Sequence, residues 1–389
     1  MNMNHQNTYL FRDILERVEV PVNVEPDKEY VQIGIRSHGK GLFYKEPVLG
    51  KILGNKQVFW IQPNCFILNV VFAWEQAITK TTENEIGMIG SHRFPMYRPK
   101  NDLVDIDYLI YYFLTKRGTD ILEAASPGGA GRNRTLGQER FLKSKITLPP
   151  LPEQQKIAAI LSTQDKVIEL KEELLAQKQQ QKKYLMQQLL TGKKRLPGFD
   201  RKWNYVKANE IFKSIVDKSH DGKLEVLSST QDKGIVPRSQ VDIDIKYNEN
   251  SLSTYKKVCE GDFVISLRSF QGGIEYSNYA GIVSPAYTVL RAIVKIDDGY
   301  YKQFFKSSNY IKRLNVAVYG IRDGKQISYD DFGQIRIPVP PIEEQREVAK
   351  VLSTADHEID LLQKSIEAEK QKKKALMQLL LTGKVSVRI

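Results

Sequence analysis

The chain has 389 residues, 41% of them hydrophobic, and its 58 lysines and arginines against 46 aspartates and glutamates give a formal net charge of +12. This length and composition allow two or three domains with cores of their own, and the charge favours a polyanionic partner such as nucleic acid. The only cysteines, Cys65 and Cys259, exclude a disulfide framework and a cysteine-based zinc site, and since no stretch approaches the roughly 18 apolar residues of a membrane span, we expect a soluble cytoplasmic protein.

The first globular segment, residues 1–148, mixes strand-like runs with one helix. Residues 31–35 and 58–61 are rich in β-branched and aromatic side chains, and the longest apolar run, 65–74, indicates a buried strand or a pair of strands. A helix is expected near 105–116, because aspartates stand at its start and basic residues followed by glycine stand at its end.

Residues 149–193 predict a long helix. Three prolines near 150 end the preceding strand, and no breaker occurs between Glu153 and Gly192. A turn-rich linker then leads into a second globular domain, residues 194–339, and residues 340–389 predict a second long helix. Within the second domain we expect strands near 224–227, 263–268 and 288–296 and a helix near 300–314.

The two long helical segments repeat each other at one constant offset without a gap. Pro-Pro-x-x-Glu-Gln occurs at 149–154 and 340–345, Leu-Ser-Thr at 161–163 and 352–354, Leu-Met-Gln at 185–187 and 376–378, and Leu-Leu-Thr-Gly-Lys at 189–193 and 380–384. The globular segments match only loosely. The chain is therefore predicted to be a tandem duplication of a globular unit followed by a long helix.

Apolar residues recur along both helices at alternating steps of four and three, as in a coiled coil. They are Ile157, Leu161, Ile168, Leu175, Leu185 and Leu189 in the first helix and Val348, Leu352, Ile359, Leu362, Ile366, Leu376 and Leu380 in the second. Two independent surface helices are the alternative. Because the second helix has no further domain to reach, we expect antiparallel packing, and hence an α+β dumbbell with a pseudo-two-fold axis and two mixed α/β domains.

Each globular segment has polar loops that carry the side chains used to read DNA. Arginine suits guanine, asparagine and glutamine suit adenine, and lysines hold phosphates. The candidates are Arg36, His38, Lys40, His92, Arg93, Arg132, Asn133 and Arg134 in the first segment and Gln231, Lys233, Arg268, Gln271, Arg322, Lys325 and Gln326 in the second. For any one loop, an ordinary solvated turn is the alternative. Lysines at 182–183 and 372–374 are candidates for contact with DNA or a partner, or for a solvated helix face.

The sequence shows no pattern for catalysis. It has no glycine-rich nucleotide loop, no Gly-Lys-Ser/Thr phosphate loop and no Asn/Asp-Pro-Pro-aromatic tetrapeptide of adenine methyltransferases, and its five histidines are scattered without metal-ligand spacing. We therefore expect no catalytic residue and no metal in this chain, and chemistry done by partners.

The doubled helical motifs resemble those of the specificity subunits of type I restriction-modification systems, and the resemblance covers essentially the whole chain. It implies two target-recognition domains held apart by the family's conserved helices, each binding one half of a two-part sequence in double-stranded DNA. It further implies two methyltransferase subunits with S-adenosylmethionine that methylate adenine, and restriction subunits, if present, that use ATP and Mg²⁺. Little sequence precedes the first domain, so any N-terminal helical element is expected to be short or missing.

Two other functions remain open. A coiled-coil scaffold that binds only proteins would share the helices but would not read DNA. A standalone nuclease with a dispersed site would turn over DNA in the presence of Mg²⁺.

Overall fold

The structure is a computed structural model that describes residues 7–54, 57–128, 134–241, 249–317 and 327–387. The chain divides into two compact units, one formed by Met1–Lys171 with Ser365–Ile389 and the other by Glu172–Lys364. Each unit thus contains one globular part and a portion of both long helices. No helix in the described ranges is both long and apolar enough to cross a bilayer.

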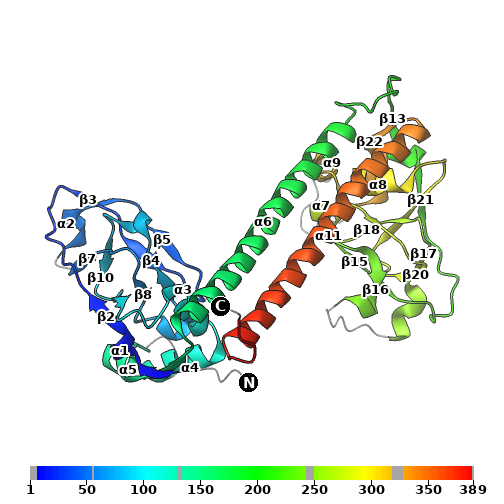
Figure 1. The fold of residues 1–389 in the computed structure, drawn as a ribbon. Helices are drawn as coiled ribbons and strands as arrows, with labels where there is room; N and C mark the ends of the chain where they lie inside the picture. Colours follow the sequence, from blue (N-terminus) through cyan, green and yellow to red (C-terminus); the bar gives the residue numbers. More distant parts are fainter. Residues whose placement is uncertain (1–6, 55–56, 129–133, 242–248, 318–326, 388–389) are drawn as a thin grey trace. The chain divides into compact units, whose positions relative to one another are not determined.

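The globular part of the first unit is built on a four-stranded antiparallel sheet, with the strand order β2-β11-β8-β9. Figure 1 labels β2 and β8 of this sheet. Two-stranded pairs surround it: β1 with β12, β3 with β6, β4 with β5 and β7 with β10. The elements are β1 (Asn7–Leu10), α1 (Phe11–Ile14), β2 (Leu15–Val18), β3 (Glu29–Tyr30), β4 (Ile33–Ile35), β5 (Leu42–Tyr44), β6 (Val48–Leu49), α2 (Gly50–Leu53), β7 (Val58–Trp60), β8 (Phe66–Leu68), η1 (Ala73–Glu75), β9 (Ile78–Lys80), η2 (Glu83–Glu85), β10 (Ile89–Ser91), β11 (Met96–Pro99), α3 (Ile106–Phe113), α4 (Lys116–Ala125), α5 (Gln138–Lys143), β12 (Lys145–Leu148) and the first part of α6 (Leu151–Leu189).

The second unit repeats this plan with the sheet order β14-β21-β18-β19. Its outer pairs are β13 with β22, β15 with β16 and β17 with β20. The elements are β13 (Asn204–Lys207), η3 (Ala208–Glu210), β14 (Phe212–Ile215), β15 (Leu227–Thr230), β16 (Gly234–Pro237), η4 (Arg238–Gln240), η5 (Glu249–Thr254), β17 (Lys256–Val258), β18 (Phe263–Ile265), α7 (Ser269–Gly272), β19 (Glu275–Tyr276), β20 (Gly281–Val283), β21 (Thr288–Ala292), α8 (Asp298–Lys306), α9 (Ser308–Ala317), α10 (Tyr329–Gln334), β22 (Arg336–Val339) and α11 (Ile342–Leu380).

Four phenylalanines form the centre of each core at corresponding places. Phe11, Phe66, Phe113 and Phe141 pack together in the first unit and Phe212, Phe263, Phe305 and Phe332 in the second, all at most 5% exposed. The ring centroids of Phe66 and Phe113 lie 5.5 Å apart, and those of Phe263 and Phe305 lie 5.2 Å apart. The duplicated core holds the sheet against the helix that follows it in both units.

The expected helices near 105–116 and 300–314 are each two helices in the structure. Asp105 caps α3 by accepting a hydrogen bond from the Tyr108 amide, and Thr115 caps α4 in the same way through the Gly118 amide. Lys116, Arg117 and Gly118 therefore begin α4 and do not end the preceding helix. In the second unit the break falls at Ser307, between α8 and α9. A side-chain oxygen that serves as an N-cap satisfies a backbone N–H and so starts a new helix.

Two of the expected strands are also shifted. The apolar run 65–74 forms a strand only over Phe66–Leu68, and its remainder is a loop that contains η1. The strand expected at 224–227 lies at Leu227–Thr230. In the run after Leu68, the Asn69 side chain accepts a hydrogen bond from the Val71 amide, and this local turn competes with strand pairing.

The long helices pair antiparallel, as the sequence predicts. In the first unit Asp165 and Lys171 of α6 bond Lys373 and Glu369 of α11. In the second unit Lys178 and Lys182 of α6 bond Glu358 and Asp356 of α11. Residue numbers therefore rise along one helix as they fall along the other. Every residue of the predicted apolar stripe is buried or half-buried, so the expected coiled coil is confirmed.

The glutamine of the repeated Pro-Pro-x-x-Glu-Gln motif joins each long helix to the helix beside it. Gln154 is fully buried, its Nε2 donates to the carbonyls of Leu103 and Pro149 at 2.9 and 2.8 Å, and its Oε1 accepts from the Asp105 amide at 3.0 Å. Gln345 donates to the Pro340 carbonyl at 2.8 Å and accepts from the Asp297 amide at 2.9 Å. The motif therefore fixes the start of the long helix against the cap of α3 or α8.

Replacement of Gln154 by alanine should destabilise this junction by about 3 kcal/mol, because three backbone groups lose the hydrogen bonds that the Gln154 side chain makes to them. Hydrogen exchange at the start of α3 would then speed up on the order of 100-fold. Gln155→Ala, at an exposed neighbouring position, is the matched control. Equal protection in both variants would contradict the role of Gln154.

Glu369 makes the stability of the helix pair depend on pH in the acidic range. Hydrogen bonds from Lys171 and Gln164, both 2.8 Å long, favour its ionised form and lower its pKa from 4.5 to about 2. A lowered carboxyl pKa contributes stability above the unfolded value, and this contribution is lost as the pH falls from 4.5 towards about 2.

The thermal midpoint of a Glu369→Gln variant should lie below that of the wild type at pH 7, and the gap should close as the pH falls through this window. Glu367→Gln, which neutralises an exposed carboxylate on the same helix, is the control. A gap that stays constant down to pH 2 would rule out the proposed linkage.

Candidate DNA-recognition site

In the first unit, the β4–β5 hairpin loop rests on the loop that follows β8. The amides of His38 and Gly39 donate to the carbonyls of Glu75 and Gln76 at 2.8 and 2.9 Å, and the Ser37 hydroxyl donates to the Glu75 carboxylate at 3.0 Å. His38 adopts a left-handed backbone, with φ of 61°. The hairpin therefore presents three exposed candidate side chains, those of Arg36, His38 and Lys40.

Two further candidate loops meet the same loop after β8. The Val70 amide donates to the Arg93 carbonyl at 3.0 Å, and the Val70 carbonyl accepts from the Leu136 amide at 2.8 Å. The guanidinium of Arg134 lies over the indole of Trp74, 5.4 Å from the ring centroid. The structure thus links the loops of Arg36, Arg93 and Arg134 through residues 69–76. Of the other candidates, His92 is exposed beside Arg93, while Arg132 and Asn133 lie outside the described residues.

In the second unit the corresponding loops also meet. Gln231 and Lys233 stand exposed in the β15–β16 turn, and Arg268 and Gln271 stand exposed at α7 after β18. The side chain of Gln231 lies so close to Gly272 that a Cβ there would be 3.0 Å from Gln231 Cγ. Glycine at 272 therefore allows the two loops to touch. The candidates Arg322, Lys325 and Gln326 lie outside the described residues.

An ion pair with a buried carboxylate holds the Gln231 loop in place. Lys306 donates to the Gln231 carbonyl at 3.1 Å and pairs with Glu275, whose side chain is 3% exposed. Burial raises the pKa of Glu275, although the nearby Lys306 opposes this effect, and Oε2 of Glu275 is buried with no hydrogen-bond partner in the described ranges. The loop position thus depends on a carboxylate whose charge is balanced by one lysine.

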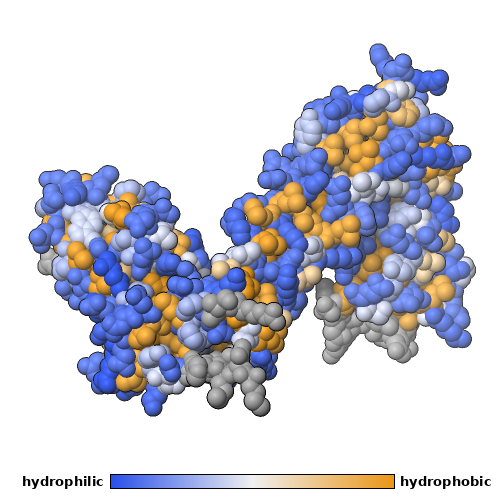
Figure 2. All heavy atoms as spheres, viewed as in Figure 1, coloured by the Kyte–Doolittle hydropathy of each residue, from blue (hydrophilic) through white to orange (hydrophobic). Residues whose placement is uncertain are grey.

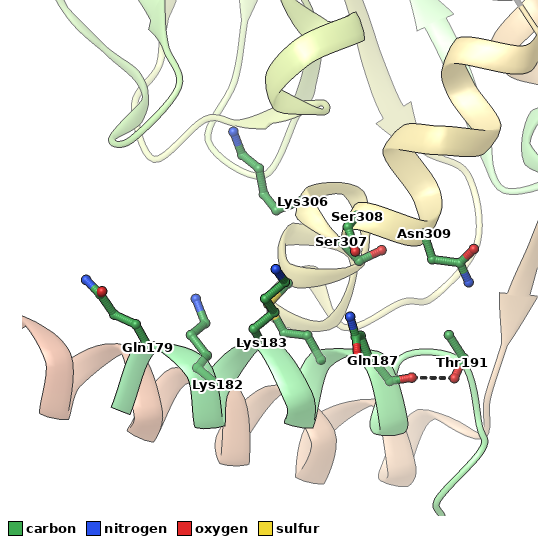
Figure 3. A pocket seen from close by; sticks show the side chains of 10 residues that line it. Gln179, Lys182, Lys183, Gln187, Thr191, Lys306, Ser307, Ser308 and Asn309 are labelled. Atoms are coloured by element: carbon green, nitrogen blue, oxygen red, sulfur yellow. Dashed lines mark hydrogen bonds between the residues drawn. The ribbon is translucent and has the colours of Figure 1, made fainter. Parts of the chain in front are cut away.

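A recess of about 220 Å³ opens between α6 and the α8–α9 junction of the same unit. Figure 3 shows Lys182, Lys183 and Gln187 of α6 pointing towards Ser307 and Ser308. Lys182 pairs with Asp356, whereas Lys183 is exposed. Lys306 lines the recess as well, so basic side chains continue from the support of the Gln231 loop to the long helix.

A larger pocket of about 630 Å³ in the first unit has the opposite character. Asp105, Asp107 and Asp165 line it together with Lys373, and the Tyr111 hydroxyl donates to Asp165 at 2.8 Å. Three carboxylates repel a phosphate backbone. The exposed basic loops, and not this pocket, are therefore suited to DNA.

These observations define a class of protein. It has two divergent copies of one globular unit, two long helices that both units share, and basic and amide side chains on neighbouring loops of each unit. The family model described as the type I restriction modification DNA specificity domain matches residues 23–179 and 200–370. The chain belongs to this family and is a non-catalytic specificity subunit of a type I restriction-modification system.

Two curated relatives come from Methanocaldococcus jannaschii. The chain is 26% identical over 313 residues to the putative type I restriction enzyme MjaX specificity subunit, covering 75% of this chain and 71% of that protein. It is 28% identical over 317 residues to the type I restriction enzyme MjaVIII specificity subunit, covering 74% and 72%.

Two solved structures show the same fold. The HsdS subunit from Thermoanaerobacter tengcongensis is 20% identical with a TM-score of 0.55, covering 98% of this chain and 97% of that one. The S subunit of the type I restriction-modification system from M. genitalium is 14% identical with a TM-score of 0.57, with coverage of 98% and 97%.

The sequence did not single out Trp74 among the site residues, because it ends an apolar run that resembles a buried strand. The structure places it half-exposed on η1, against Arg134. A comparison of the two repeats could have singled out Trp74. It stands as many residues after the start of β8 as the candidate Gln271 stands after the start of β18.

Lys306→Met should lower the free energy of unfolding of the second unit by about 2 kcal/mol, because it leaves Glu275 buried without a countercharge. The added change Glu275→Gln should restore part of this loss, since a neutral amide needs no cation. Thermal denaturation of the three variants checks the coupling, with Lys312→Met as the control at an exposed lysine of α9. Purely additive losses would show that Lys306 and Glu275 are not coupled.

Proposed function

We propose that each unit binds one half of a two-part sequence in double-stranded DNA, and that the chain directs two methyltransferase subunits to that sequence in the cytoplasm. The methyltransferase would supply S-adenosylmethionine and methylate adenine. Restriction subunits, where the system has them, would add ATP- and Mg²⁺-dependent cleavage.

One observation carries this proposal. The two units share their sheet order, their phenylalanine core and their glutamine junction. The loops after β8 and β18 differ, because Trp74 stands in the first unit at the position that Gln271 has in the second. A constant scaffold with divergent polar loops suits two domains that recognise different DNA sequences. The net charge of +12 adds attraction for phosphates without regard to sequence.

The long helices offer a surface for protein partners. Leu170, Leu174 and Tyr184 of α6 and Leu361 of α11 are 51%, 43%, 54% and 52% exposed. Figure 2 shows hydrophobic residues among the polar ones along the visible face of the helices. Exposed large apolar side chains in such number mark interaction surfaces. The same observation favours the alternative, a scaffold without DNA readout, so the deciding experiment concerns DNA.

The chain should be co-expressed with the methyltransferase of its own system, and methylated adenines should be mapped by single-molecule sequencing. We expect one two-part motif with a fixed gap. In a Gln231→Ala, Gln271→Ala double variant, one half of the motif should relax, because each lost base contact removes about 1–3 kcal/mol of discrimination. The other half should stay unchanged.

Absence of methylation by a complex shown to assemble and to bind S-adenosylmethionine would favour the scaffold. The standalone nuclease considered from the sequence does not apply, because the chain is a non-catalytic specificity subunit. Arg140→Ala, an exposed arginine on α5 outside the loop cluster, serves as the control and should leave the motif intact.

A further inference from the structure

We infer that Trp74 is a positioning residue that holds Arg134 ready to read a guanine, so that the half-site bound by the first unit contains a G·C pair at that contact. This inference rests on the proposed function and adds to it the base chemistry of one half-site. Trp74 would not itself need to touch DNA.

The indole of Trp74 is fixed by its surroundings. Its Nε1 donates to the Val71 carbonyl at 3.1 Å, and the preceding Ala73 is fully buried. Gln76, two residues after Trp74, has a left-handed backbone with φ of 59°, and its amide side chain donates to the Thr119 hydroxyl at 2.6 Å. The only side-chain donor of Trp74 is thereby satisfied, and the turn that carries the ring is bound to α4.

Arg134 uses the face of this fixed ring. Its guanidinium carbon lies 5.4 Å from the indole centroid, and within the described part of the chain no carboxylate pairs with it. A guanidinium held over an aromatic ring by a cation–π contact is restricted in its motion, while its N–H groups stay available for hydrogen bonds. It therefore loses less side-chain freedom on binding than an unsupported arginine does.

The planar guanidinium of arginine matches guanine among the four bases. Two of its N–H groups can donate side by side to O6 and N7 of guanine in the major groove, whereas adenine presents a donor beside its N7. A lysine at the same place would supply charge but not the flat pair of donors. The chemistry of Arg134 beside Trp74 thus points to guanine.

The second unit has different chemistry at the corresponding place. Gln271 stands where Trp74 stands in the first unit, and Gln231 lies against the adjacent Gly272. Glutamine can both donate and accept, the combination that adenine presents in the major groove. The contrast indicates that the two half-sites are read by different residue types, and not by one mechanism used twice.

The test uses the assembled methyltransferase complex and a set of duplexes in which each base pair of the wild-type motif is replaced in turn. The methylation rate at subsaturating DNA is compared for wild type, Arg134→Ala, Arg134→Lys, Trp74→Ala and Trp74→Phe. In the wild type, one G·C position of one half-site should discriminate about 10- to 100-fold.

Arg134→Ala and Arg134→Lys should both lose most of that discrimination at this position and at no other. Trp74→Ala should lose a large part of it, and Trp74→Phe, which keeps an aromatic face, should retain it. Arg140→Ala should leave the whole profile unchanged. A merely structural role of Trp74 would instead slow methylation on every duplex equally, and rescue by phenylalanine would not be confined to one base pair.

The inference is overturned if Arg134→Ala keeps the full base profile, or if Trp74→Ala changes rates uniformly. The two arginine variants decide the matter even if Trp74→Ala does not fold. Failure of the proposed function looks different, because the wild-type complex itself would then show no two-part motif.

Discussion

The rest of the structure depends on the hydrogen bonds that one buried glutamine makes in each unit at the start of the long helix. Gln154 and Gln345 satisfy backbone groups at the end of the last strand and at the start of α3 or α8, and so they fix where the long helix leaves the globular part. A side-chain amide both donates and accepts, which no apolar residue can do at such a junction. The adjoining Glu344 is buried too, with Arg195 and Trp203 as its donors.

The repeat separates two kinds of constraint. The phenylalanine cores and the glutamine junctions must fit closely packed neighbours, where a change of shape costs stability, and they recur in both units. The loops after β8 and β18 carry partly or fully exposed side chains such as Trp74 and Gln271, and backbone hydrogen bonds such as those of the Val70 and Gln271 amides help to hold these loops in place. Such loops can change their side chains without loss of the fold, and a reader of variable sequences requires this.

Charged side chains also differ between the scaffold and the loops. Between the helices, ion pairs such as Lys171 with Glu369 and Lys178 with Glu358 stand beside the buried apolar stripe, so both polar and apolar contacts hold the helix pair together. On the loops, by contrast, Arg93, Arg268 and Lys233 are exposed. Paired charges orient the helices, and exposed charges leave the loops attractive to an anion.

The sequence by itself determined the duplication, the two long helices with their buried stripe, and the family, because these depend on local periodicity and on repeated motifs. It also indicated that Arg36, Arg93 and Gln231 lie in exposed loops. Only the tertiary structure decided that these loops meet at residues 69–76 or at Gly272, that Thr115 and Ser307 divide the expected helices, and that Arg134 lies over the ring of Trp74. Contacts between residues far apart in the chain depend on how the strands pair and twist, and this information is not contained in any single stretch of sequence.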